Sequence, residues 1–133
     1  MIGGEGVHPL DFQVKRIAAI RAAVSERFFI NARTDLLLKT DNHDDALIDQ
    51  VVERGKALAD AGASGFFVPR LADTKQIERV VREVPLPLNV IAFPGAPDKA
   101  LWASAGVARI SHGPFPHRAL MSHLAEAARV AIN

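Results

Sequence analysis

Residues 28–35 read FFINARTD, a short apolar run that ends abruptly in polar side chains. Consecutive bulky β-forming residues, here 28–30, are typical of a strand buried on both faces, as strands are in a parallel sheet. The polar residues that follow would then lie at the carboxyl end of this strand. Parallel α/β folds bind their ligands at that edge, so the stretch predicts both a buried strand and a candidate site.

The same unit of apolar strand and amphipathic helix repeats along the rest of the chain. Asp44 and Asp45 are suited to begin a helix, because acidic residues are favourable at its positive N-terminal end, and Asp73 is suited to cap another. Gly62 is suited to end a helix. Strands are predicted at residues 28–30, 65–68, 88–92 and 107–111, and helices at 9–27, 44–62, 73–81, 98–105 and 116–132. Alternation of this kind indicates parallel strands covered by helices, with residues 1–133 forming one α/β domain.

Composition excludes several classes of function. The chain has 133 residues, of which 49% are hydrophobic and 23% charged, as expected for one folded domain of about 150 residues or fewer. It has no cysteine, which excludes disulfides, thiolate metal sites and a cysteine nucleophile. A net charge of +1 argues against nucleic acid or an anionic membrane as a partner. No apolar run approaches the roughly 20 residues of a membrane span, so we expect a cytoplasmic protein.

Arg33 is the first candidate for ligand binding. A guanidinium at a strand end binds a carboxylate or phosphate through two parallel hydrogen bonds. Asn31 and Asp35 lie beside it in the sequence. The alternative is that Arg33 and Asp35 form a structural ion pair that ends the strand, and spacing alone does not separate the two interpretations.

Three further strand ends carry polar side chains. Asn89 is a carboxamide in an apolar strand, so it either contacts a ligand or belongs to an internal hydrogen-bond network. Arg70 follows the second strand, where an exposed basic residue is the simpler interpretation. His112 precedes a Gly-Pro turn and is either an acid–base group or a solvated loop side chain. The spacing of the histidines, with His117 and His123 six residues apart, predicts no histidine metal site.

Four motifs occur in the order and spacing of a known superfamily: FINARTD (29–35), AGASGFFVP (61–69), PLNV (87–90) and AGVARIS (105–111). Together they resemble the isocitrate lyase/phosphoenolpyruvate mutase superfamily, in particular its phosphonomutase-like branch. The resemblance implies a (β/α)8 TIM barrel. Because such a barrel takes about 250 residues, it also implies that this chain corresponds to the C-terminal half, with four parallel strands alternating with helices.

The resemblance also implies a chemistry. Members act on C–C or P–C bonds of small α-keto or enol acids through an enolate stabilised by Mg²⁺, whose charge offsets that of the enolate oxygen. Carried over, Arg33 and Asp35 are catalytic, and Asn31, Arg33 and Asn89 bind the substrate. Glu5, in Gly4-Glu5-Gly6, would be a remnant metal contact from the family's Glu-Asp-Gly motif, and the main magnesium ligands of the family would precede Met1. The lyase branch uses a gating-loop cysteine, which this chain lacks, so isocitrate-type cleavage is disfavoured.

Half a barrel has two unpaired sheet edges and an inner face shaped to be covered. We expect that face to expose apolar side chains, and therefore expect a homo-oligomer. The alternatives are an open flavodoxin-like sheet and a piece of a longer protein. For function, the alternative is a catalytically incomplete relative that only binds an anion or a partner. An unrelated α/β sheet with a phosphate-type ligand is a third hypothesis, which strand order would distinguish.

Overall fold

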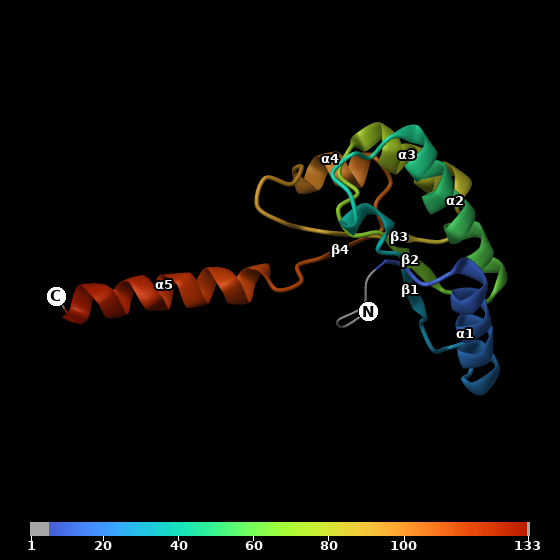
Figure 1. Ribbon diagram of the computed structural model, residues 1–133, viewed down its shortest axis with the longest axis horizontal. Coiled ribbons are helices and arrows are strands. Elements are labelled where there is room, and N and C mark those ends of the chain that lie inside the picture. The colour runs from blue at the N-terminus through green and yellow to red at the C-terminus, as the bar shows by residue number, and fades with distance from the viewer. Residues whose placement is uncertain (1–5, 133) are drawn as a thin grey trace.

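A computed structural model describes residues 6–132 and contains one four-stranded sheet with helices (Figure 1). The elements follow in the order α1 (Leu10–Ala23), β1 (Asn31–Arg33), the 3-10 helix η1 (Leu36–Leu38), α2 (Asp45–Asp60), β2 (Gly65–Phe67), α3 (Thr74–Glu83), β3 (Leu88–Ile91), α4 (Lys99–Ser104), β4 (Arg109–Ser111) and α5 (Phe115–Ile132). The strands lie in the order β1-β2-β3-β4 and are all parallel. Each strand pairs with the next one along the chain, as in a barrel segment, whereas a doubly wound sheet reverses its order. The prediction of half a TIM barrel is confirmed.

Local sequence signals account for the helix boundaries. The Asp44 carboxylate accepts a hydrogen bond from the Leu47 amide, and that of Asp73 accepts one from the Gln76 amide, so both cap their helices as predicted. After α2 and α4 the chain turns through Gly62 (φ +93°) and Gly106 (φ +89°), a conformation that side chains disfavour. The repeated Ala-Gly pairs therefore mark the two turns from helix to strand.

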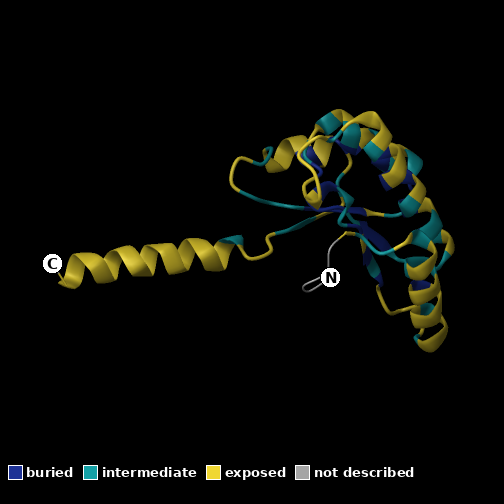
Figure 2. Ribbon diagram, viewed as in Figure 1, coloured by how far each residue is buried: buried dark blue, intermediate teal, exposed yellow. Residues whose placement is uncertain are grey.

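The hydrophobic core lies between the sheet and the helices that cover one of its faces (Figure 2). Ala32, Phe66 and Leu88 are register partners on three neighbouring strands, and all are buried. Buried apolar residues of α2 and α3, among them Ile48 and Ile77, belong to the same cluster. Because side chains alternate along a strand, the residue that follows each of these partners on its strand points to the opposite face of the sheet.

The predicted position of the first strand is wrong by about one strand length. β1 comprises Asn31–Arg33, while Phe28 and Phe29 are 54% and 57% exposed. The Arg21 guanidinium donates to the carbonyls of Ser25 and Phe28 and thereby holds this segment as a turn. Residues 28–30 are apolar enough to predict a strand, but strand pairing begins only at Asn31, where β2 supplies hydrogen-bond partners. The polar residues Asn31 and Arg33 therefore lie within the strand and not after it.

The last predicted helix forms but does not cover the sheet. α5 projects away from the rest of the chain (Figure 1), and none of its residues is buried. Its exposed apolar residues are Leu120, Met121, Leu124, Val130 and Ile132. Within residues 6–132 no helix, α5 included, is long and apolar enough to cross a membrane.

Candidate functional site

One row of side chains crosses the face of the sheet that the helices leave open. Arg33, Phe67, Asn89 and Arg109 are register partners on the four successive strands. Register partners in a parallel ladder point to the same face, so the four side chains form a single layer. We expected this face to be apolar, yet the row contains two arginines and an amide. The open face is therefore better suited to a polar ligand than to simple burial.

Arg33 is held in place from two sides. Its Nε donates to the Asp35 carboxylate at 2.6 Å, and its guanidinium carbon lies 5.4 Å from the centroid of the Phe67 ring. The Arg33 side chain is nevertheless half exposed. The predicted ion pair thus forms, but it occupies only the Nε edge, and the two terminal nitrogens have no hydrogen bond to any described residue. An ion pair that orients a guanidinium is compatible with ligand binding.

The backbone of Arg33 is fixed by the helices. Gln13 of α1 donates from Nε2 to the Arg33 carbonyl at 2.6 Å and accepts at Oε1 from Arg54 of α2 at 2.7 Å. Arg54 also donates to the carbonyl of His8. Burial lowers the pKa of the Arg54 guanidinium, and the neighbouring Glu53 carboxylate opposes this effect. The end of β1 is therefore anchored to both helices, which limits its movement when a ligand binds.

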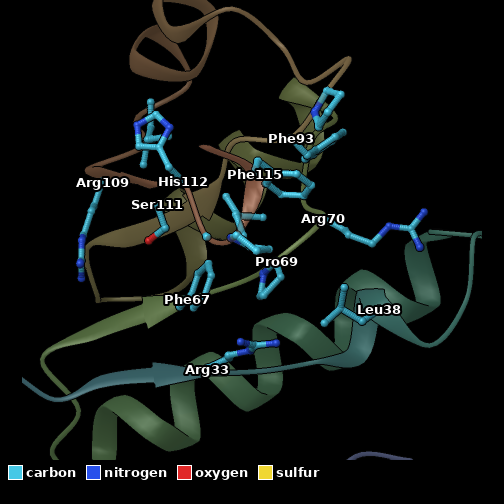
Figure 3. A pocket seen from close by; sticks show the side chains of 15 residues that line it. Arg33, Leu38, Phe67, Pro69, Arg70, Phe93, Arg109, Ser111, His112 and Phe115 are labelled. Carbon is cyan, nitrogen blue, oxygen red and sulfur yellow. The ribbon is translucent and has the colours of Figure 1, made fainter. Parts of the chain in front are cut away.

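A cavity of about 950 Å³ opens beside this row, at the carboxyl ends of the strands (Figure 3). Three arginines, a serine, a histidine and three phenylalanines line it, and among residues 6–132 no carboxylate does. The lining residues used below are Arg33, Phe67, Arg70, Arg109, Ser111 and His112. Three cations around one cavity favour an anionic ligand. The structure thus brings together Arg33, Arg70, Ser111 and His112, which the sequence placed at three separate strand ends.

Of the two roles that its sequence position left open, Asn89 has the second, membership of an internal hydrogen-bond network. It is 1% exposed, and its Oδ1 accepts a hydrogen bond from the Ser111 hydroxyl at 3.1 Å, so it belongs to an internal network. Its Nδ2 finds no acceptor within the described residues. Ser111 lines the cavity and Asn89 does not. The amide therefore acts on the cavity through the serine hydroxyl.

Of the other predicted site residues, Asn31 and Asp35 line smaller cavities and not the main one. Asn31 lies toward the start of β1, beside Gly65, and lines a separate cavity of about 280 Å³ between α1 and β1. Asp35 shares with Arg33 a further cavity of about 710 Å³. Glu5 lies outside residues 6–132. The structure therefore brings Asp35, but not Asn31, to the Arg33 guanidinium.

The described residues do not by themselves fit a magnesium ion. Mg²⁺ binds oxygen ligands in octahedral geometry and usually takes one or two protein carboxylates. Residues 6–132 bring no three His, Cys, Asp or Glu side chains together as a metal site. The one carboxylate beside Arg33, that of Asp35, is engaged by the guanidinium. Magnesium ligands would have to come from elsewhere.

Sequence reasoning missed Arg109 as a member of the site. Arg109 is the first residue of β4, and its side chain points to the open face, as that of its register partner Asn89 does. The available signal was a charged residue in the middle of the apolar strand predicted at residues 107–111. Phe93 and Phe115 of the cavity wall gave no comparable signal, because both lie outside the strands.

Comparison with known proteins gives relatives of greater length. The sequence model of the family described as phosphoenolpyruvate phosphomutase matches residues 2–132. An uncharacterized protein of Mycobacterium tuberculosis is 34% identical over 114 residues, which are 86% of this chain and 42% of that protein. The "Probable 2-methylisocitrate lyase 2" of Corynebacterium glutamicum is 36% identical over 95 residues, 69% of this chain and 29% of that protein. The chain spans less than half the length of these curated relatives.

Solved structures show the same relation. A "putative phosphonomutase" from Burkholderia cenocepacia J2315 superposes with a TM-score of 0.84 at 41% identity, over 93% of this chain and 52% of that one. Phosphoenolpyruvate phosphomutase from Streptomyces platensis subsp. rosaceus has a TM-score of 0.77 at 19% identity, over 93% of this chain and 43% of that one, and supports the fold. The chain belongs to the phosphoenolpyruvate phosphomutase family, in the phosphoenolpyruvate mutase/isocitrate lyase superfamily.

Proposed function

We propose that this chain binds a small α-keto or enol acid in the arginine-lined cavity. It would do so as the substrate-binding half of a cytoplasmic enzyme that acts on C–C or P–C bonds. The observation that carries the proposal is the Arg33 guanidinium, held by Asp35 and Phe67 at the edge of a cavity that no carboxylate of the described residues lines. A carboxylate seated there makes charge-assisted hydrogen bonds to the terminal nitrogens of Arg33.

Each neighbouring group has a defined task in this proposal. Asp35 positions the guanidinium, and the Phe67 ring supports its face. Ser111, fixed by Asn89, presents a hydroxyl to the ligand. Asn31 lies one row nearer the strand starts and contacts only a ligand that extends below Arg33. Magnesium would offset the charge of the enolate oxygen, with ligands from outside residues 6–132, Glu5 among them.

A second function, anion binding without turnover, is favoured by one observation: within the described part of the chain, no carboxylate lines the cavity to act as a base or to hold a metal. A titration with oxalate, an enolpyruvate mimic, in the presence and absence of Mg²⁺ separates the two. Binding of oxalate that requires Mg²⁺ supports the enzyme-like function. Binding that is indifferent to Mg²⁺ supports the anion-binding function, and no binding under either condition contradicts both.

We also propose that the chain forms homo-oligomers through α5. An isolated helix is marginal in water, because helices in proteins are stabilised mainly by packing an apolar face. α5 has 18 residues and exposes several apolar side chains without any contact that buries them. A second copy of the chain would supply the missing surface.

Replacing both Leu120 and Leu124 by glutamate is therefore expected to shift the chain from oligomer to monomer in sedimentation equilibrium. Ser122→Glu, on the same helix, is the control for added charge and should leave the mass unchanged. A wild-type chain that sediments as a monomer at all concentrations would rule out this association.

A further inference from the structure

Arg70 has a backbone conformation that its side chain disfavours. Its φ is +67°, and every other described residue with positive φ is a glycine. In the left-handed region the Cβ atom approaches the following carbonyl oxygen, so any residue with a side chain is strained there. Glycine would adopt the same conformation without strain. The local backbone conformation therefore favours glycine over the arginine that occupies this position.

The surrounding turn leaves Arg70 little freedom. Pro69 and Leu71 on either side are buried, and the Leu71 amide donates to the Val68 carbonyl at 3.4 Å to close the turn after β2. Arg70 alone among these residues is exposed, and it lines the cavity together with Arg33. Figure 3 shows the two guanidiniums on different sides of the cavity. The fold thus places a second cation at the cavity rim.

The present partner of Arg70 does not explain the strain. The guanidinium donates from Nη2 to the Asp41 carboxylate at 2.7 Å, but the Asp41 side chain is 91% exposed. Ion pairs at such exposure contribute little to stability. Strained residues persist only where the surrounding structure holds them, and they cluster at ligand sites. The contact with Asp41 shows that the Arg70 guanidinium binds a carboxylate at this position. Because the Asp41 side chain is exposed, water or the carboxylate of a ligand can replace it.

We propose that Arg70 is a specificity-determining residue, which binds a second anionic group on an acid whose first carboxylate is held by Arg33. The inference rests on the proposed function and adds the preference for dianionic acids to it. Arg33 ends β1, and Arg70 lies three residues beyond Phe67, the register partner of Arg33 on the adjacent β2, so both arginines lie at the carboxyl-end edge of the sheet and line one cavity. A dicarboxylate bound across this cavity would place its far carboxylate on Arg70, in the place of Asp41.

The test compares succinate with succinamate, which has the same length but only one carboxylate. Wild type should bind succinate about tenfold more tightly, as a charge-assisted hydrogen bond implies. Arg70→Gly should reduce this preference to less than twofold. Because glycine relieves the strained backbone, the same variant should also melt about 4 °C higher.

Asp41→Asn is the matched control, because it breaks the same ion pair and keeps the guanidinium. It should retain the preference for succinate or increase it about twofold. The inference is overturned if Arg70→Gly keeps the preference, if Asp41→Asn loses it, or if wild type does not prefer succinate. If oxalate still binds through Arg33 in these cases, the role of Arg70 is refuted and the proposed function is not. If neither oxalate nor succinate binds, both the role of Arg70 and the proposed function are refuted.

Discussion

Arg33→Ala is expected to weaken oxalate binding by about 100-fold or more, as measured by isothermal titration calorimetry. The variant removes two charge-assisted hydrogen bonds to the carboxylate, each of which contributes about 1.5 kcal/mol or more. Arg33→Lys keeps the charge but not the planar pair of donors, so it should recover only part of the affinity. The Asp35 contact of Arg33 is at the surface, and the variant should therefore unfold close to the wild-type temperature.

Arg79→Ala is the matched control for this experiment. Arg79 lies on α3, pairs with Asp49 and Glu83, and does not line the cavity. Its removal deletes the same side chain and the same charge, so a general electrostatic effect would appear in both variants. Equal oxalate affinity in Arg33→Ala and wild type would refute the assignment of the anion site.

Phe66→Ala and Phe67→Ala should have opposite consequences although the residues are neighbours. Phe66 is fully buried against the helices, and truncation of such a ring destabilises by about 3–5 kcal/mol. That is a large part of the roughly 5–15 kcal/mol by which domains are stable. Phe67 lies on the open face, partly exposed, where it supports the Arg33 guanidinium. Its truncation should weaken oxalate binding by about two- to fivefold, as loss of a cation–π contact implies.

Urea denaturation followed by circular dichroism measures the first effect, and calorimetry with oxalate measures the second. Each variant is the control for the other, because both remove the same ring from the same strand. The assignment of the two faces fails if Phe67→Ala unfolds as readily as Phe66→Ala. It also fails if a folded Phe66→Ala protein loses oxalate binding while Phe67→Ala retains it.

The sequence by itself determined the elements and their direction. Asp44 and Asp73 begin helices because their carboxylates satisfy free amide groups of the first turn, a contact between residues three apart. Gly62 and Gly106 end helices because each adopts a conformation that other residues disfavour. Such signals are local, so they can be read without a fold. Alternation of helices and strands then indicated a parallel sheet.

The tertiary structure decided which residues share the site. Arg33 and Arg109 belong to one row only because three successive strand pairings align them, and no local pattern specifies a register. Arg70 lines the same cavity because its backbone adopts a strained conformation, which the presence of an arginine in the sequence does not predict. Likewise, Phe28 and Phe29 carry the signature of a buried strand, but strand pairing starts where a partner strand lies. Local chemistry set the elements, and long-range pairing set the site.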